Sequence, residues 1–348
     1  TMAEKVKWGV IGAGGIARRR TIKETIMYAQ MAEIKALMDI DEKVVKEVGR
    51  EWGIDRWFTD VEKLLQEDIE AVYIASPNYV HYQQAKASLE AGKHVLCEKP
   101  LSLTLEEGKE LALIAEEKGL KLGVAFMMRF NVYHKEIKRL IEEGALGQLV
   151  AGRAQLTCWY PPLPSAWRQD KEKGGGGALI DMGCHCIDLL EWFFGETIEV
   201  AAFLDTITHS YLVEDTSTAI LKFRNGAQGI VDNYFNVPDK AAKNILEVYG
   251  TKGAVIAHQT IGQDPGGKMW LYQEKGEKSY NAEQEREENA YKEIKLEPLS
   301  LYAQEIDAFS QWIRGGEKPV ISYEVGLRNS KVIEAIYRAQ EEKRVITV

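Results

Sequence analysis

A glycine-rich segment directly after the first apolar run constrains the fold more strongly than any other part of the sequence. Residues 6–11 have the length and apolar composition of a buried strand, and residues 12–17 read Gly-Ala-Gly-Gly-Ile-Ala. Gly12 permits a sharp turn from strand to helix, Gly14 lets the backbone approach a pyrophosphate, and Ala17 allows the helix to pack closely on the strand. The first amide groups of such a helix favour phosphate. The pattern predicts a dinucleotide site whose phosphate-binding residues are Gly12, Gly14, Gly15 and Ile16.

An acidic residue at the end of the second predicted strand supports this interpretation. Asp39 follows Ala17 by 22 residues and ends the run 33–38. A carboxylate there can bind the ribose hydroxyls of NAD, and it repels the 2′-phosphate of NADP. Arg18 to Arg20, near the helix start, favour NADP instead. Cations at this end of a helix are opposed by the helix dipole, and a nearby anion such as the 2′-phosphate would explain them. We expect NAD, with NADP as the alternative cofactor and a solvated loop acid as the alternative reading of Asp39.

Composition excludes several classes of partner. The 348 residues carry 44 basic and 53 acidic side chains, a net charge of −9, without a basic block. Such a chain is not expected to bind nucleic acid or an anionic membrane, and no apolar stretch approaches the roughly 20 residues of a membrane helix. Four cysteines do not make a disulfide framework in a chain of this length. We expect a cytoplasmic, reduced protein.

The first part of the chain alternates strands with helices. Helix-length amphipathic segments, such as 79–91 and 104–117, separate short apolar runs. Strands and helices in this order predict a doubly wound parallel sheet with helices on both faces. Thr104 fits a helix N-cap and Gly92 a helix C′ position. The expected strands are 6–11, 33–38, 71–75, 94–97 and 120–125.

The pattern changes after Phe126, which divides the α/β chain into a dinucleotide-binding domain at 1–127 and an α+β domain at 128–348. Later strands are joined by short turns such as Arg224-Asn225-Gly226, which indicates mainly antiparallel pairing. The charged stretch 274–295 is expected to be an exposed excursion. The expected helices of this part are 132–143, 178–194, 299–313 and 323–340, and the expected strands are 149–159, 199–207, 216–223, 228–235, 245–250 and 254–258.

Lys99 is a candidate for the reaction site because it ends the strand predicted at 94–97, within Glu98-Lys99-Pro100. Pro100 restricts Lys99 to an extended conformation. Ligands of open α/β sheets bind at the carboxyl ends of the strands, so Lys99 is expected to point toward a nicotinamide. The alternative is a solvated surface lysine.

A second candidate group lies on the helix predicted at 178–194. Asp181, His185 and Asp188 have the spacing of one helical face within an apolar segment. Histidine titrates near neutrality and suits proton transfer from a hydroxyl, and a carboxylate one turn away can orient it. The alternatives are a core histidine, a capping acid, or a metal site made with Cys184 and Cys186. Adjacent helical residues point in different directions, so no metal is expected.

Taken together, these segments resemble the Gfo/Idh/MocA family, named for glucose–fructose oxidoreductase, inositol dehydrogenase and MocA. The resemblance spans the whole chain. Its motifs are specific for the family and much less so for a substrate. The proline-rich residues 161–164 are not a general family feature. Besides the glycine motif, the matching segments are Ser76-Pro77-Asn78 with His81, Ala91-Gly92-Lys93-His94-Val95, Glu98-Lys99-Pro100, Arg129-Phe130-Asn131, Trp167-Arg168, Asp181 with His185, and Gly326-Leu327.

The resemblance implies a role for individual residues. Lys99, Asp181 and His185 correspond to the catalytic trio of the family. Lys99 supplies the electrophile, so no metal is needed. Cofactor contacts are implied for Ser76, Asn78, His81, Glu98, Lys99, Trp167 and Arg168, in addition to the glycine motif and Asp39. Substrate contacts are implied for Lys99, Asn131, Tyr160, Arg168, Asp181 and His185.

The resemblance also implies an activity and an assembly. It indicates hydride transfer between NAD(P) and a secondary hydroxyl of a sugar, cyclitol or derivative. It further implies an N-terminal Rossmann domain and a C-terminal domain with a large open, mainly antiparallel sheet, whose face joins the subunits of a homodimer or homotetramer. An NADPH-dependent keto-sugar reductase is the related alternative. The alternative of another class is a non-catalytic regulator that binds the dinucleotide.

Overall fold

The computed structural model describes residues 4–276, 280, 282–284 and 290–348. It divides the chain into two compact units built from discontinuous segments. The first unit is Thr1–Met127, Ser165–Ile180 and Ser300–Lys331, and the second is Met128–Pro164, Asp181–Leu299 and Val332–Val348. Two segments that follow residue 128, Ser165–Ile180 and Ser300–Lys331, thus belong to the first unit. Whether residues 1–127 form a domain by themselves stays a prediction.

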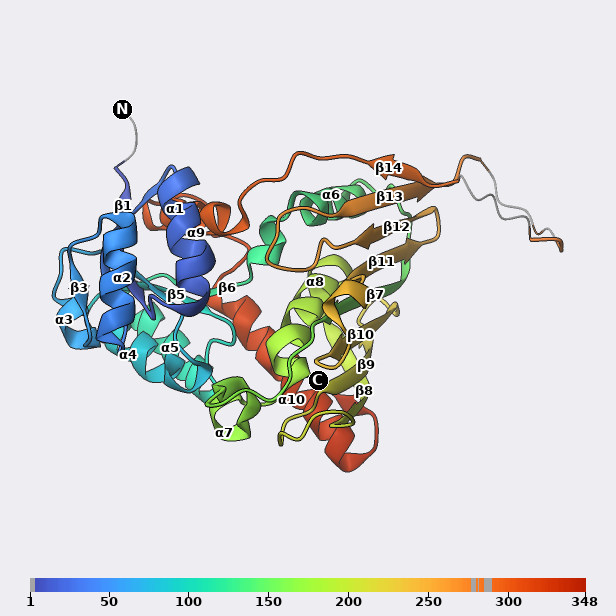
Figure 1. The fold of residues 1–348 in the computed structure, drawn as a ribbon. Coiled ribbons are helices and arrows are strands. Elements are labelled where there is room, and N and C mark those ends of the chain that lie inside the picture. Colours follow the sequence, from blue (N-terminus) through green and yellow to red (C-terminus); the bar gives the residue numbers. More distant parts are fainter. Residues whose placement is uncertain (1–3, 277–279, 281, 285–289) are drawn as a thin grey trace. The chain divides into compact units, whose positions relative to one another are not determined.

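The first unit contains the predicted doubly wound parallel sheet (Figure 1). Its strand order is β3-β2-β1-β4-β5-β6, so the chain reverses direction across the sheet between β1 and β4. The carboxyl ends of these two strands form the switch point where ligands bind in such sheets. The strands are β1 (Val6–Ile11), β2 (Ala32–Met38), β3 (Trp57–Phe58), β4 (Ala71–Ile74), β5 (His94–Glu98) and β6 (Leu122–Ala125).

Local sequence signals set the helix ends in this unit. The side chain of Asp41 accepts hydrogen bonds at the start of α2, and Gly53 ends this helix with φ +67°. Thr104 and Glu107 form a capping box at the start of α5, and Gly92 follows α4 with φ +75°, as expected from the sequence. The α-helices of this unit are α1 (Ile22–Tyr28), α2 (Glu42–Trp52), α3 (Val61–Leu65), α4 (His81–Glu90), α5 (Leu105–Glu117), α7 (Lys171–Gly174) and α9 (Leu301–Ile313).

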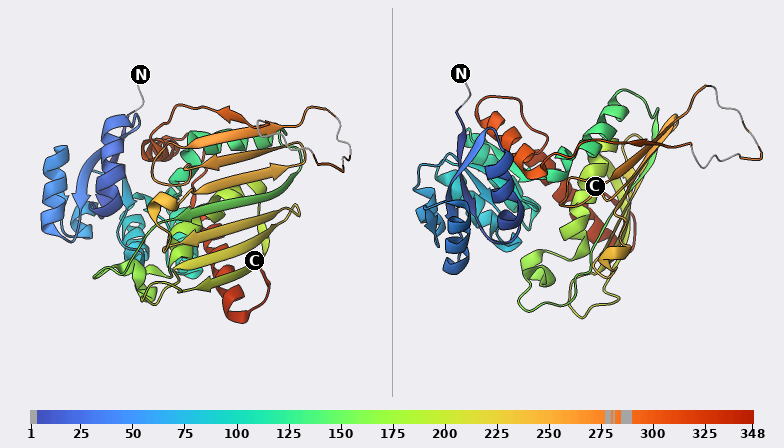
Figure 2. Two further views of the ribbon diagram at one scale, coloured as in Figure 1. Left: turned by 45° about the vertical axis from the view of Figure 1, so that its right-hand side comes forward. Right: turned by 45° about the horizontal axis from the view of Figure 1, so that its top comes forward.

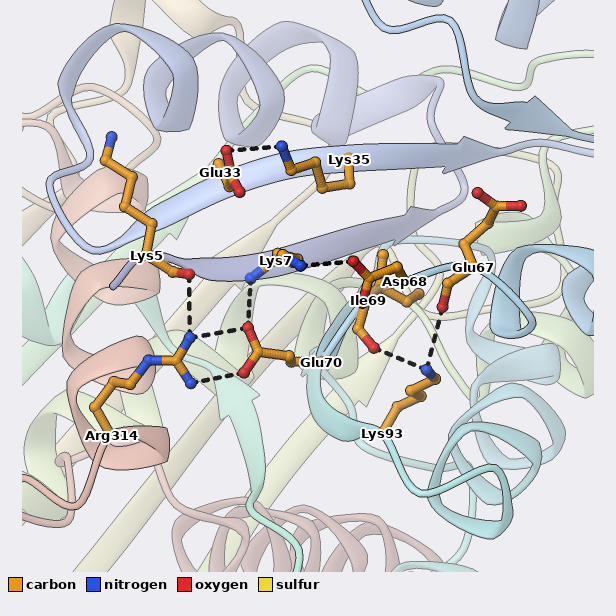
Figure 3. A network of polar contacts seen from close by, with 10 residues as sticks. All are labelled: Lys5, Lys7, Glu33, Lys35, Glu67, Asp68, Ile69, Glu70, Lys93 and Arg314. Carbon is orange, nitrogen blue, oxygen red and sulfur yellow. Dashed lines mark hydrogen bonds and ion pairs between the residues drawn. The ribbon is translucent and has the colours of Figure 1, made fainter. Parts of the chain in front are cut away.

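Helix α9 is joined to the N-terminal part of the first unit by polar contacts. Trp8 in β1 donates its indole hydrogen to Ser310 at 3.0 Å. Just after α9, Arg314 donates to both carboxylate oxygens of Glu70 at 2.6 and 2.9 Å and to the carbonyl oxygen of Lys5 at 3.1 Å (Figure 3). These contacts connect positions about 240 to 310 residues apart, so no local sequence pattern signals them.

The second unit contains a nine-stranded sheet, with β7 and β10 parallel and the other neighbouring pairs antiparallel (Figure 2). Helix α8 packs on β7 and β10, and α6 packs on α8. The helices are α6 (Val132–Glu142), α8 (Cys184–Phe194) and α10 (Tyr323–Glu342), whose first part belongs to the first unit. In sheet order the strands are β14 (Lys292–Ile294), β13 (Lys268–Gln273), β12 (Gly253–His258), β11 (Ile245–Gly250), β7 (Leu149–Thr157), β10 (Gln228–Tyr234), β9 (Thr216–Phe223), β8 (Thr197–Asp205) and β15 (Ile346–Thr347).

One sequence expectation for this part of the chain needs correction. The helix expected at 178–194 begins as a π-helical turn, Leu179–Gly183, and becomes α-helical only at Cys184. The described residues of the stretch expected to be an exposed excursion are mostly exposed, and they include the strand Lys292–Ile294, which pairs with β13. Residues 277–279, 281 and 285–289 of that stretch lie outside the described residues. Within the described ranges, no helix has the length and apolar character needed to span a bilayer.

Candidate active site

The glycine turn lies where β1 meets β4. Gly12 adopts φ +84°, and a Cβ atom on it would stand 2.6 Å from the backbone nitrogen of Ser76. No larger residue can make this close approach. Gly15 adopts φ +50°, and a Cβ there would meet no atom within 4 Å. Such a turn with open space at its tip fits the pyrophosphate of a dinucleotide. The predicted α-helix after it begins as a π-helical turn, Ala17–Thr21.

Asp39 lies beside this turn, as the spacing predicts. Its Oδ2 accepts a hydrogen bond from the backbone nitrogen of Gly14 at 3.0 Å, and its Oδ1 accepts one from the backbone nitrogen of Asp41 at 3.0 Å. Two of the neighbouring arginines are paired with acidic side chains. Arg18 pairs with Glu47 and Glu51 on α2, at 3.3 and 3.1 Å, and Arg20 pairs with Glu24 at 3.4 Å. The charges of Arg18 and Arg20 are thus paired within the protein and need no 2′-phosphate, whereas Arg19 is exposed.

Three of the predicted cofactor residues make internal hydrogen bonds at this edge of the sheet. Ser76 donates its hydroxyl hydrogen to Gln84 at 2.5 Å, and Asn78 donates to the carbonyl oxygen of Gly174 at 2.9 Å. The ring nitrogens of His81 face the carbonyl oxygens of Pro100 at 2.7 Å and Ser76 at 2.8 Å. Asn78 and His81 are buried. The structure thus gives these side chains a supporting role, and their contact with the cofactor stays a prediction.

Positive charge gathers near the ends of β4 and β5. Burial lowers the pKa of His81, and the nearby charges of Lys99 and Arg168 lower it further. The guanidinium of Arg168 lies 4.2 Å from the ring centroid of Trp167. The bond between Lys99 and Pro100 is a cis peptide. The first unit therefore brings Lys99, Arg168 and the dinucleotide turn to the same edge of its sheet.

An acidic group beneath this edge consists of Glu98, whose contact with the cofactor stays a prediction, and Glu305, which was not singled out from the sequence. Tyr73 in β4 donates its hydroxyl hydrogen to Glu98 at 2.5 Å, and the backbone nitrogen of Lys99 donates to the same carboxylate at 3.3 Å. Glu305 on α9 is fully buried, and neither of its carboxylate oxygens has a hydrogen-bond partner among the described residues. Burial raises the pKa of Glu305 well above its ordinary value, and the negative charge of Glu98 adds to this effect.

We expect Glu305→Leu to raise the free energy of unfolding at neutral pH by about 1–3 kcal/mol, because it removes an unsatisfied buried polar group. The folded chain binds the Glu305 proton more tightly than the unfolded chain, whose glutamate pKa is about 4.3. The part of the cost that comes from ionising Glu305 is therefore absent below this pH and grows as the pH rises above it. Urea denaturation between acid and neutral pH measures the difference. Glu297→Leu, at an exposed acid, is the control, and a gain from Glu305→Leu that does not depend on pH would contradict the prediction.

In the second unit, the three residues predicted to share a helical face have different environments. Asp181 lies in the π-helical turn and is half-buried, and His185 lies in the first turn of α8 and is buried. Asp188 is buried and bound by Arg129, whose Nε lies 2.9 Å from Oδ2 and whose second terminal nitrogen lies 2.8 Å from Oδ1. The wider π-helical turn changes the angular offset between Asp181 and His185 from that of a regular α-helix. Asp188 therefore belongs to a buried ion pair.

The two weaker substrate candidates in this unit are used for internal contacts. Asn131 is fully buried; its Oδ1 accepts the hydrogen bond that caps α6, and its Nδ2 donates to the carbonyl oxygen of Thr260 at 3.3 Å. The ring of Tyr160 packs on Phe235 at 5.0 Å between centroids. Substrate contact by Asn131 and Tyr160 stays a prediction. Within the described residues, no three His, Cys, Asp or Glu side chains are grouped as metal ligands.

Fold and nucleotide site together define an oxidoreductase of the NAD-binding Rossmann type. Residues 6–126 match the family model described as "Oxidoreductase family, NAD-binding Rossmann fold", and residues 134–256 match the "GFO/IDH/MocA C-terminal domain". The chain belongs to the GFO/IDH/MocA family, as its sequence motifs predict. This membership confirms the predicted enzyme class, the NAD(P) cofactor and the two-part fold.

Relatives of known name cover most of the chain. It is 31% identical over 327 residues to a 1,5-anhydro-D-fructose reductase of Ensifer adhaerens, with 92% of each chain covered. It is 30% identical over 281 residues to a levoglucosan dehydrogenase of Pseudarthrobacter phenanthrenivorans, covering 71% of this chain and 72% of that one. A solved structure of levoglucosan dehydrogenase in complex with NADH is 25% identical and superposes with a TM-score of 0.86, covering 99% of each chain.

Proposed function

We propose that the enzyme transfers a hydride between nicotinamide and the carbon of a secondary hydroxyl on a sugar, cyclitol or derivative. The observation that carries this proposal is the first unit's edge, where the dinucleotide turn and Asp39 lie with Lys99 and Arg168. The names of the relatives, an anhydrofructose reductase and a levoglucosan dehydrogenase, support the substrate class. NAD, when bound, supplies the hydride acceptor, and a reduced cofactor supplies the hydride in the reverse direction.

The residues of this chain divide the remaining work between them. In the oxidative direction, His185 takes the proton of the substrate hydroxyl while the hydride leaves the carbon that bears this hydroxyl. Asp181 orients His185 or accepts from the hydroxyl, and Lys99 stabilises the developing alkoxide by its positive charge. Trp167 and Arg168 hold the cofactor and the substrate. In reduction the same groups act in reverse, and His185 returns the proton.

Nicotinamide absorbance tests the function directly. The purified enzyme is mixed with NAD or NADP and a panel of aldoses, anhydrosugars and cyclitols, and with NADH or NADPH and the matching keto-sugars. We expect turnover with at least one member. Turnover only with NADPH and a keto-sugar would favour the reductase. Tight NAD binding with no turnover across the panel would favour a non-catalytic regulator.

Cofactor preference is predicted from Asp39. In the wild-type enzyme we expect a higher kcat/KM with NAD than with NADP. Asp39→Asn keeps an acceptor for the Gly14 amide but removes the charge, so kcat/KM with NAD should fall about 10- to 100-fold, the value of a hydrogen bond to a charged group. Activity with NADP should rise. Glu42→Gln removes a nearby charge on α2 and is the control; equal activity of the wild type with both cofactors would contradict the prediction.

We further infer a homodimer or homotetramer formed through the sheet face opposite α8. Large apolar side chains on this sheet remain exposed: Phe203 is 83%, Ile220 52% and Ile230 42% exposed, and Ile220 pairs with Ile230 across β9 and β10. Contiguous apolar surface of this kind is typical of protein interfaces. Sedimentation of the Ile220→Lys variant against Lys222→Ala tests the assembly, and a monomeric wild type would contradict it. The cytoplasmic location expected from cysteine usage stays a proposal, which cell fractionation would test.

A further inference from the structure

An aromatic cluster in the second unit takes no part in the proposed reaction. The ring of Trp159 meets that of His209 edge-on at 5.1 Å between centroids, and His209 lies 5.1 Å from Tyr211. Trp159 is 45% exposed although tryptophan usually lies largely buried. We propose that Trp159, His209 and Tyr211, here called the aromatic platform, bind a second sugar ring of the substrate next to the ring that reacts. The inference rests on the proposed function and extends it from single sugars to glycosides and disaccharides.

Hydrogen bonds fix the backbone of Trp159 and the side chains of His209 and Tyr211. The backbone nitrogen of Trp159 donates to Asp239 at 2.9 Å. The Nε2 of His209 lies 2.9 Å from the carbonyl oxygen of Phe235, and the hydroxyl of Tyr211 donates to the carbonyl oxygen of Tyr160 at 2.8 Å. Each ring or its backbone is therefore fixed to a neighbouring segment. A surface fixed in this way loses little conformational entropy when a ligand binds.

A buried aspartate shapes the loop that carries His209 and Tyr211. Asp215 is fully buried and accepts hydrogen bonds from the backbone nitrogens of Ile207, Thr208 and His209 at 2.8–3.0 Å. Burial would raise the pKa of Asp215, but these backbone hydrogen bonds keep it below its ordinary value. Asp215 is thus ionised at neutral pH and holds the loop beside Trp159.

The platform and the candidate base lie at the same end of the sheet. Strands β7 and β10 are parallel, and their last residues, Thr157 and Tyr234, are paired. Trp159 follows the first of these ends and Phe235 the second. On α8, Cys186 directly follows His185 and accepts a hydrogen bond from Asn233, the residue before Tyr234, at 3.5 Å. The first turn of α8 is therefore anchored near the strand ends from which the platform begins.

The chemistry of the platform matches a sugar better than a protein. A pyranose ring presents C–H groups on its faces and hydroxyls around its edge, and the flat, electron-rich face of an indole attracts such C–H groups. Polar groups stand around the platform: the exposed carboxylate of Asp239 and the exposed side chains of Thr208 and Ser210. Three partly exposed rings offer much less than the roughly 800 Å² per partner of a stable protein interface. A single sugar ring is of the right size.

The platform does not hold the reacting atoms, so its loss should affect binding and leave the chemical step unchanged. A group that contributes equally to the ground state and the transition state changes KM and leaves kcat unchanged. Disaccharides and glycosides should therefore have a lower KM than the monosaccharides they contain. The difference should disappear when Trp159 is removed.

Binding without turnover gives a test that does not depend on the proposed reaction. Saturation-transfer NMR and calorimetry with cellobiose, maltose and glucose compare the wild type with Trp159→Ala and Trp159→Phe. We expect at least one disaccharide to bind, Trp159→Ala to weaken it about tenfold, the value of about 1.4 kcal/mol, and Trp159→Phe to recover most of the affinity. The matched control is Trp270→Ala. Trp270 lies on β13, outside the platform, and its ring also meets a histidine edge-on, that of His258 on β12, at 5.3 Å between centroids. Thermal unfolding confirms that the variants fold.

The possible outcomes separate the platform from the reaction. Disaccharide binding that depends on Trp159 supports the platform even when the absorbance panel is silent, in which case only the proposed function fails. Equal effects of Trp159→Ala and Trp270→Ala, or binding of no disaccharide, would overturn the platform. A change in sedimentation of Trp159→Ala with sugar binding intact would also overturn it and assign the rings to a contact between copies of the chain. If cellobiose or maltose is turned over, Trp159→Ala should keep kcat within about twofold of the wild type and raise KM about tenfold.

Discussion

Replacing Arg129 with alanine is expected to destabilise the protein by about 3–5 kcal/mol, the usual cost of removing one partner of a buried ion pair. Asp188 is 2% exposed, and three hydrogen bonds of 2.8–3.1 Å join it to the Arg129 guanidinium. Burial raises the pKa of Asp188, and Arg129 opposes this shift. Without Arg129, a carboxylate would remain in an apolar site, so the folded state would favour the protonated acid.

The pH dependence of this loss separates it from simple loss of packing. In Arg129→Ala, the folded-state pKa of Asp188 should rise further above its unfolded value of about 3.9. The variant then recovers stability as the pH falls toward that value, because the folded state binds more protons. Chemical denaturation at neutral and acid pH measures this recovery.

Two further variants complete the test. Arg129→Met combined with Asp188→Leu should regain most of the stability at neutral pH, because two apolar side chains leave no charge buried. Arg139→Ala breaks exposed pairs with Glu136 on α6 and with Glu143 just after it, and it should cost about 0–1 kcal/mol. A loss from Arg129→Ala as small as that from Arg139→Ala would show that the buried pair contributes little.

Asp188 also shows where sequence reasoning about the site fails. The spacing of Asp181, His185 and Asp188 predicts one polar face only if the helix is regular, but the segment begins with a π-helical turn. The partner that uses Asp188 lies 59 residues earlier in the chain. Neither the turn type nor the distant partner leaves a local signal. The motif Arg129-Phe130-Asn131 was recognised, but the role of its arginine could not be inferred from spacing.

The dinucleotide site, by contrast, was predictable because its determinants are local. A short stretch of sequence shows a strand, a glycine directly after it and an acid at the end of the next strand. In the structure this glycine, Gly12, adopts a positive φ. Asn131 carried a usable signal as well: an asparagine directly before a helical pattern is a typical N-cap, and it caps α6 in the structure. Glu305 carried none, because its burial depends on how α9 packs on the parallel sheet.

His185→Ala is expected to lower kcat by about 10²- to 10⁴-fold on whichever sugar the absorbance panel identifies, the usual contribution of a general base. Binding of NAD should stay nearly unchanged, because the dinucleotide turn, Asp39 and Arg168 belong to the first unit and His185 to the second. Stopped-flow turnover and calorimetric NAD titration measure the two quantities separately.

A merely structural His185 would give a different pattern, because loss of folding lowers the amount of active enzyme without changing its pH profile. In the wild type, kcat should fall on the acid side as the base becomes protonated, and His185→Ala should lose this limb. His258→Ala removes a histidine of the same unit whose ring lies against Trp270, and it should keep both the rate and the limb. A folded His185→Ala enzyme with the wild-type rate would refute the assignment, because no general base can be removed at so small a cost.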